Sequence, residues 1–182
     1  MNAVKFHNHF IYYIVRIYID FSQILCYNKY RKNERKLIVV NDSHLFKIAR
    51  QCSLRADYNG CCRAKIGCIV VYKNAILAKG WNSDKTHTAQ AHYNKWRYKN
   101  SGNDYLPEKL HAEIGCLEKI KYLDISFSRV HLYIYRELKN GQLAMARPCA
   151  ACMAAIREMG IRHIHYTTEC GFAHEILKGD TL

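Results

Sequence analysis

The sequence predicts an α/β fold, a three-layer α/β/α domain with a mixed four- or five-stranded sheet. Three observations predict it. One helical pattern is followed by two strand patterns that only a short turn separates, which indicates a β-hairpin. Two later passages run from strand through helix to strand, and such connections favour parallel pairing. The last connection is too short for a crossover helix, so a fifth strand there has to be antiparallel.

The domain is expected to begin at about residue 41. Residues 41–43 are good helix-capping residues, and apolar side chains then recur at helical spacing from Leu45 to Ala56. The hairpin follows, with two strands and the turn between them at 66–72, 75–81 and Lys73-Asn74.

Residues 1–40 differ in composition from the rest of the chain, because Ile, Tyr, Val and Phe dominate residues 10–27. Four polar residues in or next to this run fall on one face of a helix: His9, Arg16, Asp20 and Gln23. This stripe argues against a membrane span, and we expect neither a transmembrane segment nor a signal peptide. Two readings of this N-terminal extension stand open, an amphipathic helix or sequence that is not truly coding.

The long connection at 83–110 is expected to hold a helix from Ala89 to Lys99 near the mouth of a site. Aromatic and basic side chains interleave along it: Tyr93, Lys95, Trp96 and Lys99. Such side chains can stack on and neutralise single-stranded nucleic acid, although an aromatic pair at spacing three more often packs inside. These four residues are candidates for contacts with nucleic acid or with a substrate at the mouth of the site.

The second half of the chain alternates helices and strands. The expected order is a helix at 111–123, a strand at 130–135, a helix at 149–159, a strand at 161–167 and a last strand at 172–177. Pro148 suits the first position of the helix at 149–159, and Gly160 suits its end. If 172–177 are helical instead, the sheet has four strands.

Three residues have the types and spacing of a metal site: His111, Cys149 and Cys152. The two cysteines are three apart and share one face of a first helical turn, where the helix dipole favours the thiolate that binds zinc. Three protein ligands leave the fourth corner of a tetrahedral zinc ion open for water. A lone Cys-x-x-Cys is more often half of a structural zinc site or a redox pair, but a redox pair needs no His111 or Glu113. The sequence therefore predicts one catalytic zinc ion.

Glu113 is the candidate acid and base of this site. Water on zinc has a pKa of about 7 and needs a neighbouring base to relay its proton. Residues two apart in mid-helix point about 200° away from each other, so His111 and Glu113 converge only if a helix begins at about residue 111. We therefore expect a helix start there.

His-x-Glu followed by Pro-Cys-x-x-Cys is the signature of zinc-dependent deaminases, and the chain matches it without substitution. From about residue 41 to 182 the chain resembles the cytidine deaminase superfamily. The resemblance implies a cytidine deaminase-like fold and hydrolytic deamination. Zinc-bound hydroxide would attack the carbon that bears the amino group, with Glu113 as proton shuttle. The resemblance also assigns Asn82, in Gly80-Trp81-Asn82, to the substrate sugar, and adds Ala112 to the substrate-binding residues.

Composition indicates the compartment and the charge of the partner. A chain of 182 residues with 49% hydrophobic residues supports one folded domain, 41–182, beside the extension. Nine cysteines without a regular framework indicate a reducing, cytoplasmic compartment in which thiols stay free or bind metal. The formal net charge is +13, and residues 1–40 hold seven Lys or Arg and two Asp or Glu, which leaves +8 on the domain. This balance favours an anionic substrate or a polyanionic partner.

The preferred hypothesis is a zinc-dependent cytidine/deoxycytidylate-type deaminase, a hydrolase acting on C–N bonds of cyclic amidines in nucleotide metabolism. It would convert cytosine to uracil in a free nucleotide or nucleoside, with dCMP preferred. One alternative is a cytosine or adenine deaminase acting on single-stranded DNA or RNA. The other is a catalytically silent zinc-binding module, against which Glu113 argues. We also expect a homo-oligomer.

Overall fold

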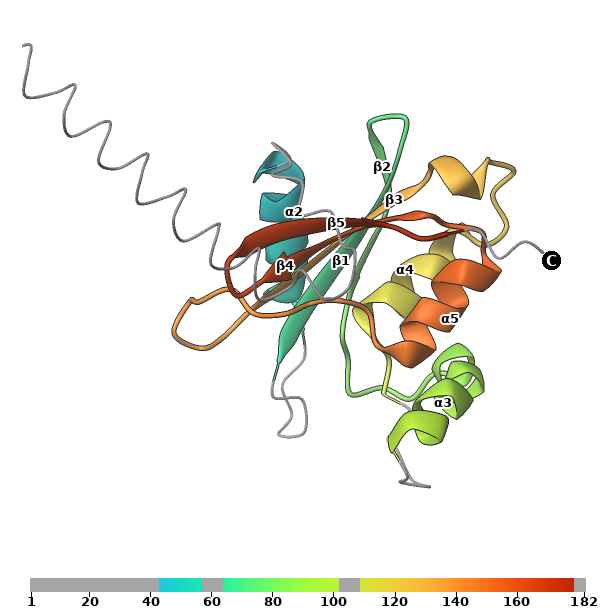
Figure 1. Cartoon of the computed structure of the whole chain (residues 1–182), viewed down its shortest axis with the longest axis horizontal. Coiled ribbons are helices and arrows are strands. Elements are labelled where there is room, and N and C mark those ends of the chain that lie inside the picture. The colour runs from blue at the N-terminus through green and yellow to red at the C-terminus, as the bar shows by residue number, and fades with distance from the viewer. Residues whose placement is uncertain (1–42, 57–63, 102–108, 179–182) are drawn as a thin grey trace, which may run out of the picture. The chain divides into compact units, whose positions relative to one another are not determined.

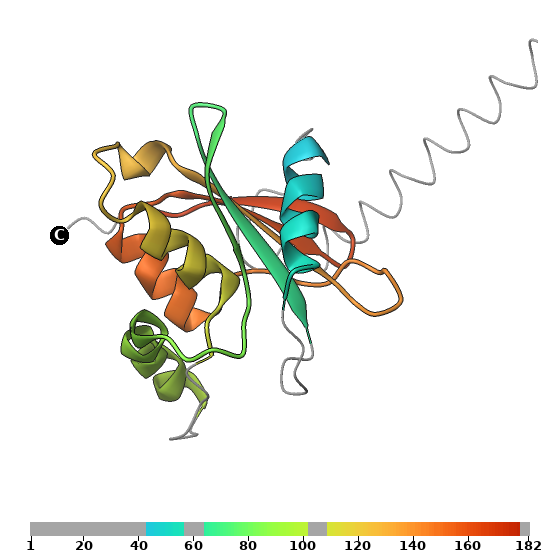
Figure 2. The ribbon, with the colours of Figure 1, turned by 180° about the vertical axis from the view of Figure 1, so that it is seen from behind.

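The computed structural model describes residues 43–56, 64–101 and 109–178, and of residues 98–101 only the backbone. These residues form the predicted three-layer α/β/α fold around a five-stranded mixed sheet of order β2-β1-β3-β4-β5. Helix α2 covers one face of the sheet, and α4 and α5 cover the other (Figures 1 and 2).

The helices and strands have the types that the sequence pattern predicts, with bounds shifted by a few residues, and one 3-10 turn was not predicted. In chain order they are α2 (Ser43–Ser53), β1 (Lys65–Tyr72), β2 (Ala75–Trp81), α3 (Thr88–Ser101), α4 (Ala112–Ile120), a 3-10 turn (Phe127–Arg129), β3 (His131–Glu137), α5 (Ala150–Glu158), β4 (His163–Thr168) and β5 (Gly171–Ile176). Lys73 and Asn74 both have positive φ, 48° and 64°, as a tight two-residue hairpin turn requires. The predicted hairpin is thus confirmed.

One of the two predicted parallel pairings is wrong. β3 and β4 are parallel and joined through α5, as expected. The passage from β2 to β3 does not pair these strands, because β1 lies between them and is antiparallel to both. The reason is burial: β1 is buried along most of its length and therefore takes the inner position beside β3, which leaves β2 at the edge of the sheet. β5 is antiparallel to β4, which confirms the fifth strand.

Along each strand, successive side chains point to opposite faces of the sheet and pack in two different layers. On the α2 face, Phe46 packs edge-to-face on Tyr133 with ring centroids 5.4 Å apart, and Ile69 lies in the same cluster. Leu132 and Ile134, which flank Tyr133 in β3, point to the opposite face and are fully buried there. The sheet therefore separates two environments, and the sequence-predicted zinc ligands lie on the side of α4 and α5.

Residues 1–40 lie outside the described residues, so the predictions for the N-terminal extension are untested. Among the helices that the structure describes, none is long and apolar enough to cross a membrane. The described cysteines buried in the core carry free thiols, but Cys170, in the exposed turn before β5, is disulfide-bonded, contrary to the expectation of reduced thiols throughout.

Gly80 allows α4 to approach the hairpin closely. A Cβ atom at Gly80 would lie 2.5 Å from the carbonyl oxygen of Ala112 and 2.8 Å from the Sγ atom of Cys116. Both neighbours belong to α4, the helix whose first turn carries Glu113. The absence of a side chain at Gly80 therefore sets the distance between the sheet and the start of α4.

We predict that Gly80→Ala lowers the free energy of unfolding by about 1–3 kcal/mol, because the new methyl group overpacks the contact with α4. Gly115→Ala is the matched control, since its Cβ would meet only the Leu110 side chain at 3.6 Å. That change should be neutral or stabilising by up to about 1 kcal/mol, because alanine favours a helix. Urea unfolding of both variants measures the difference, and equal losses would contradict the proposed contact.

Candidate active site

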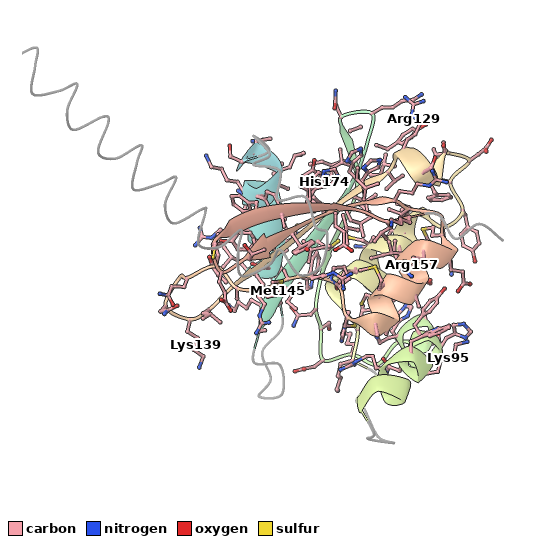
Figure 3. The ribbon with its side chains drawn as sticks, in the orientation of Figure 1. Lys95, Arg129, Lys139, Met145, Arg157 and His174 are labelled. Carbon is pink, nitrogen blue, oxygen red and sulfur yellow. The ribbon has the colours of Figure 1, made fainter. Side chains whose placement is uncertain are left out.

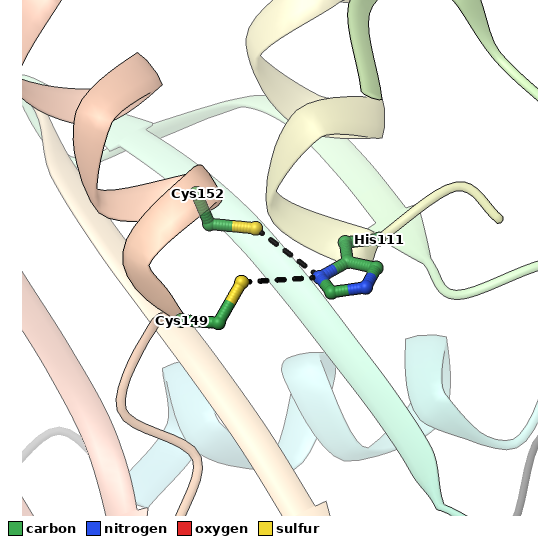
Figure 4. A group of neighbouring side chains, drawn as sticks. All are labelled: His111, Cys149 and Cys152. Atoms are coloured by element: carbon green, nitrogen blue, oxygen red, sulfur yellow. Dashed lines mark hydrogen bonds between the residues drawn. The ribbon is translucent and has the colours of Figure 1, made fainter. Parts of the chain in front are cut away.

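The site lies where α4 and α5 begin. His111 is the N-cap residue of α4 and Cys149 the N-cap residue of α5, and both have extended backbone conformations. Neither side chain caps its own helix, and the two point toward each other (Figure 4). The predicted helix start at about residue 111 is confirmed. Pro148 was expected at the first position of α5, but it precedes the N-cap because Cys149 takes that place.

The three predicted ligands converge on one point. The Nδ1 atom of His111 lies 3.6 Å from the Sγ atom of Cys149 and 3.3 Å from that of Cys152. One ligand atom from each residue fits within 4.8 Å of the others. Sulfur and nitrogen bound to one tetrahedral zinc ion at normal bond lengths are about 3.6 Å apart, so the geometry suits zinc.

Glu113 lies beside these ligands, in the first turn of α4, and is only 4% exposed. Its Oε2 atom is buried and makes no hydrogen bond among the residues that the structure describes. Burial raises the pKa of Glu113, while the neighbouring His111 lowers it. A buried carboxylate oxygen without a partner is costly unless a ligand or metal-bound group meets it. This unsatisfied oxygen is a second observation, besides the donor set, that fits zinc at this site.

The ligands influence one another electrostatically. A hydrogen bond from Cys152 lowers the pKa of Cys149 to about 3, and His111 contributes in the same direction against burial. The bond with Cys149 and then burial raise the pKa of Cys152. Burial opposes protonation of His111, but the hydrogen bond with Cys149 and the charge of Glu113 outweigh it and raise its pKa. The lowered pKa of Cys149 favours its thiolate, the form that binds zinc.

Gln90 of α3 holds the backbone of His111, and the sequence did not single it out. Its Oε1 atom accepts a hydrogen bond from the His111 N–H at 3.1 Å, and its Nε2 atom donates to Asn94 Oδ1 at 2.9 Å. Both amide side chains are fully buried. The sequence did contain one signal for Gln90: it and Asn94 are amide residues four positions apart, so they share a face of the helix.

Arg147 anchors the segment that leads into Cys149. Its guanidinium donates two hydrogen bonds of 2.8 Å to the carboxylate of Glu175 on β5. Ala146 N–H donates to the carbonyl oxygen of Thr167 at the end of β4. No sequence spacing pairs Arg147 with Glu175, because their contact depends on the antiparallel return of β5.

The predicted substrate residues are placed as follows. Asn82 lies at the end of β2, where its Oδ1 atom accepts from Ile66 N–H and its Nδ2 atom donates to the Ala64 carbonyl, both at 2.8 Å. These bonds close the open end of the hairpin. Ala112 is fully buried against Gly80. Substrate contacts by Asn82 and Ala112 stay predictions.

The predicted mouth residues are not gathered at the zinc ligands. Tyr93 is half-buried, and burial and then Glu158 raise its pKa. Lys95 is exposed, and the Lys99 side chain lies outside the described residues. Trp96 is 43% exposed and lines a hollow of about 810 Å³ beside α5, with basic side chains from Arg147, Arg157, Arg162 and Lys178. None of the predicted zinc ligands lines this hollow, although α3 reaches the site through Gln90.

Comparison with known proteins identifies the family. The model of the cytidine and deoxycytidylate deaminase zinc-binding region matches residues 40–168. The chain therefore belongs to the cytidine and deoxycytidylate deaminase family. Because the matched region is the family's zinc-binding region and the donor set fits, the cofactor is zinc.

Solved structures resemble the chain at low sequence identity. Cytidine deaminase from Burkholderia pseudomallei shares 15% identity over 75% of this chain and 93% of its own, with a TM-score of 0.51, which shows the common fold. The apo dCMP deaminase from cyanophage S-TIM5 shares 25% identity over 71% of this chain and 84% of its own, with a TM-score of 0.46. The same enzyme with dCMP and dUMP shares 24% identity over 69% and 79%, with a TM-score of 0.44. No curated protein matches the chain.

We predict that Gln90→Met lowers the free energy of unfolding by about 1–3 kcal/mol, because the partly buried His111 N–H loses its acceptor. Gln142→Ala, in an exposed turn, is the control and should stay within about 0.5 kcal/mol of wild type. Chemical unfolding of both variants measures the difference. A Gln90→Met protein as stable as wild type would show that this bond does not hold the start of α4.

Proposed function

We propose that the protein is a zinc-dependent deaminase that hydrolyses cytosine to uracil in a free nucleotide, with dCMP as the preferred substrate. The observation that carries this proposal is the buried carboxylate of Glu113, whose Oε2 atom lacks a partner among the described residues, beside His111, Cys149 and Cys152. Membership of the cytidine and deoxycytidylate deaminase family supports the cytosine substrate.

His111, Cys149 and Cys152 would hold the metal through one imidazole nitrogen and two thiolate sulfurs. Bound there, zinc supplies a Lewis acid that activates water for attack on the ring carbon bearing the amino group. The N-termini of α4 and α5 face this point, and their dipoles favour the two negatively charged sulfurs.

Glu113 would move the protons of the reaction. Its Oε2 atom can accept a proton from the attacking water, deliver it to the ring nitrogen next to the reacting carbon, and later protonate the departing amine. Water and the cytosine base thereby become uracil and ammonia. The burial of Glu113 within α4 keeps this carboxylate in one position and excludes bulk water from the transfer.

We predict that Glu113→Gln retains zinc and loses turnover by about 10²–10⁴-fold, because the amide keeps the shape but cannot accept the proton. Cys149→Ala, in contrast, should lose both zinc and turnover. Zinc content and ammonia release are measured on the same preparations. Loss of zinc in Glu113→Gln would make Glu113 a ligand, and retained turnover would remove it from the mechanism and favour a silent zinc-binding module.

A second candidate substrate is cytosine or adenine in single-stranded nucleic acid. The hollow beside α5 favours it, because an exposed tryptophan and several arginines line the same surface. Aromatic rings stack on bases and guanidinium groups bind phosphates, so this surface has the composition of a strand-binding groove. Neither His111 nor Glu113 lines this hollow, which supports the smaller nucleotide as the first choice.

Salt dependence distinguishes the two substrates. A strand held by about four phosphate contacts should lose roughly 50-fold in affinity between 50 and 200 mM salt, whereas one nucleotide phosphate gives a much shallower slope. We predict faster ammonia release from dCMP than from cytidine or an oligonucleotide, with a shallow slope. Replacing Lys95 and Lys99 together by alanine should leave dCMP turnover nearly unchanged. Faster deamination of the oligonucleotide, with a steep slope that this double variant reduces, would establish the second candidate.

A further inference from the structure

Four histidines gather on the face of the sheet opposite α4 and α5. They come from three adjacent strands: His131 on β3, His163 and His165 on β4, and His174 on β5. Register places His131 beside His163 and His165 beside His174. His165 is only 3% exposed and stacks on Tyr133, a core residue of the α2 face, with ring centroids 4.2 Å apart. Figure 3 labels His174 in this region.

The imidazole rings of this histidine cluster are stacked, and they are also hydrogen-bonded in pairs. The rings of His165 and His174 are 4.1 Å apart and inclined by only 3°, and those of His131 and His163 are 4.4 Å apart and inclined by 12°. His131 Nδ1 lies 3.0 Å from His165 Nε2, and His163 Nδ1 lies 3.2 Å from His174 Nε2. Each bond needs one protonated and one unprotonated nitrogen. The packing therefore suits neutral rings, because positive charges on stacked rings repel each other at such distances.

The cations nearest to the cluster add to this repulsion. Arg129 precedes β3 and Arg162 precedes β4, and both side chains are exposed. Helix α2 packs on the same face of the sheet through apolar side chains, whereas its ionisable residues His44 and Lys47 are exposed. The described elements that adjoin the cluster thus contribute positive charge or apolar surface.

The two carboxylates on the strands of the cluster are bound to arginines. Glu137, at the far end of β3, accepts hydrogen bonds of 2.9 and 3.3 Å from Arg50. Glu175 on β5 points to the opposite face, where it accepts two bonds of 2.8 Å from Arg147. Neither carboxylate is therefore placed to balance a positive charge on the histidine cluster.

These surroundings disfavour protonation in the folded state. Burial, and then the charges of His174, His131 and His163, lower the pKa of His165 to about 3. Burial and then Arg162 lower the pKa of His163. A histidine in an unfolded segment has a pKa of about 6.5, so it takes up a proton below that pH while folded His165 does not. The resulting stabilisation is complete above pH 6.5 and is lost as the pH falls below it, which favours separation of the strands.

Strand β5 is the part of the cluster that can separate most easily. It lies at the edge of the sheet and pairs with β4 alone. Glu175, the residue after His174, binds Arg147, which stands two residues before Cys149 in the chain. Release of β5 would therefore also release the anchor of the segment that carries Cys149.

We propose that the histidine cluster makes the attachment of β5 sensitive to acid. Below about pH 6.5, local opening of β5 takes up one proton from solution on His165, so acid increases the open population. Opening separates Glu175 from Arg147 and thereby loosens the segment before Cys149. The chain would thus respond to acidification through residues that are separate from the zinc ligands, on the other face of the sheet.

Amide hydrogen exchange of the zinc-loaded full chain tests this inference. Uptake of one proton by a group with an open-state pKa of 6.5 raises the open population about tenfold between pH 7.5 and 5.5. After correction for intrinsic exchange rates, amides of β5 should therefore exchange about tenfold faster at pH 5.5, and those of the inner strand β1 much less so. His165→Phe, which keeps a ring stacked on Tyr133, should reduce the change in β5 to less than about twofold. His44→Phe, at an exposed position on α2, should behave as wild type.

Zinc loss to a chromogenic chelator tests the link to Cys149 in the same proteins. Acid protonates the zinc ligands directly in both, so the comparison is between the wild type and His165→Phe. The ratio of release rates at pH 5.5 and 7.5 should be about tenfold larger in the wild type. Equal ratios would show that opening of β5 does not reach the Cys149 segment.

Imidazole NMR of the wild-type protein gives a reading that does not depend on any variant folding. His165 should stay neutral in the folded protein at pH 5.5. The proposal is wrong if folded His165 takes up a proton near pH 6.5, if exchange in β5 does not accelerate with acid, or if His165→Phe keeps the wild-type acceleration. Equal acceleration in β1 and β5 would also overturn it, because that result indicates global unfolding and not local opening of β5.

Discussion

The candidate active site depends on two helices that begin at the same point, each with its N-cap side chain turned toward the other helix. Serine, threonine or aspartate at an N-cap normally satisfies an unpaired backbone N–H, and omitting that bond costs about 1 kcal/mol per helix. His111 and Cys149 make no such bond. Metal coordination by these side chains would offset the cost, because it uses the same side chains and is favoured by the same helix dipoles. The helix starts and the zinc ligands are therefore one structural requirement.

The position of α4 in turn depends on the sheet. Gly80 lets the start of α4 approach β2, and Gln90 fixes the His111 backbone from the other side. The ion pair between Arg147 and Glu175 attaches the segment before Cys149 to β5. Contacts from three separate parts of the chain thus hold the two N-termini at a distance that matches one ion. Such support is what a preorganised site needs, since small displacements of a ligand weaken both metal binding and catalysis.

Residue spacing along the sequence predicted the features that depend on the local backbone alone. The hairpin turn at Lys73-Asn74 and the helix start at His111 follow from backbone rules and were confirmed. The position of β1 between β2 and β3 was not predicted, because pairing between strands distant in sequence depends on the burial of each strand and not on the length of the connection. Gln90 was missed for a related reason, since a buried amide and an exposed one look alike in a helical pattern. The roles of Glu113 and Asn82 in the chemistry stay predictions.

Strand alternation explains how one small sheet keeps the candidate active site and a cluster of stacked histidines on opposite faces. In β4, Ile164 and Tyr166 point toward the helices of the candidate active site, whereas His165 points to the other face. A shift of one residue would exchange these sides and bury imidazoles in the apolar layer under α5. The short turn into β5 prevents that shift, because it fixes His174 opposite His165 and Glu175 opposite Ile164. The same register therefore sets both the Arg147 anchor beside Cys149 and the ring stack of the histidine cluster, so a change in the turn at 169–170 would affect both faces.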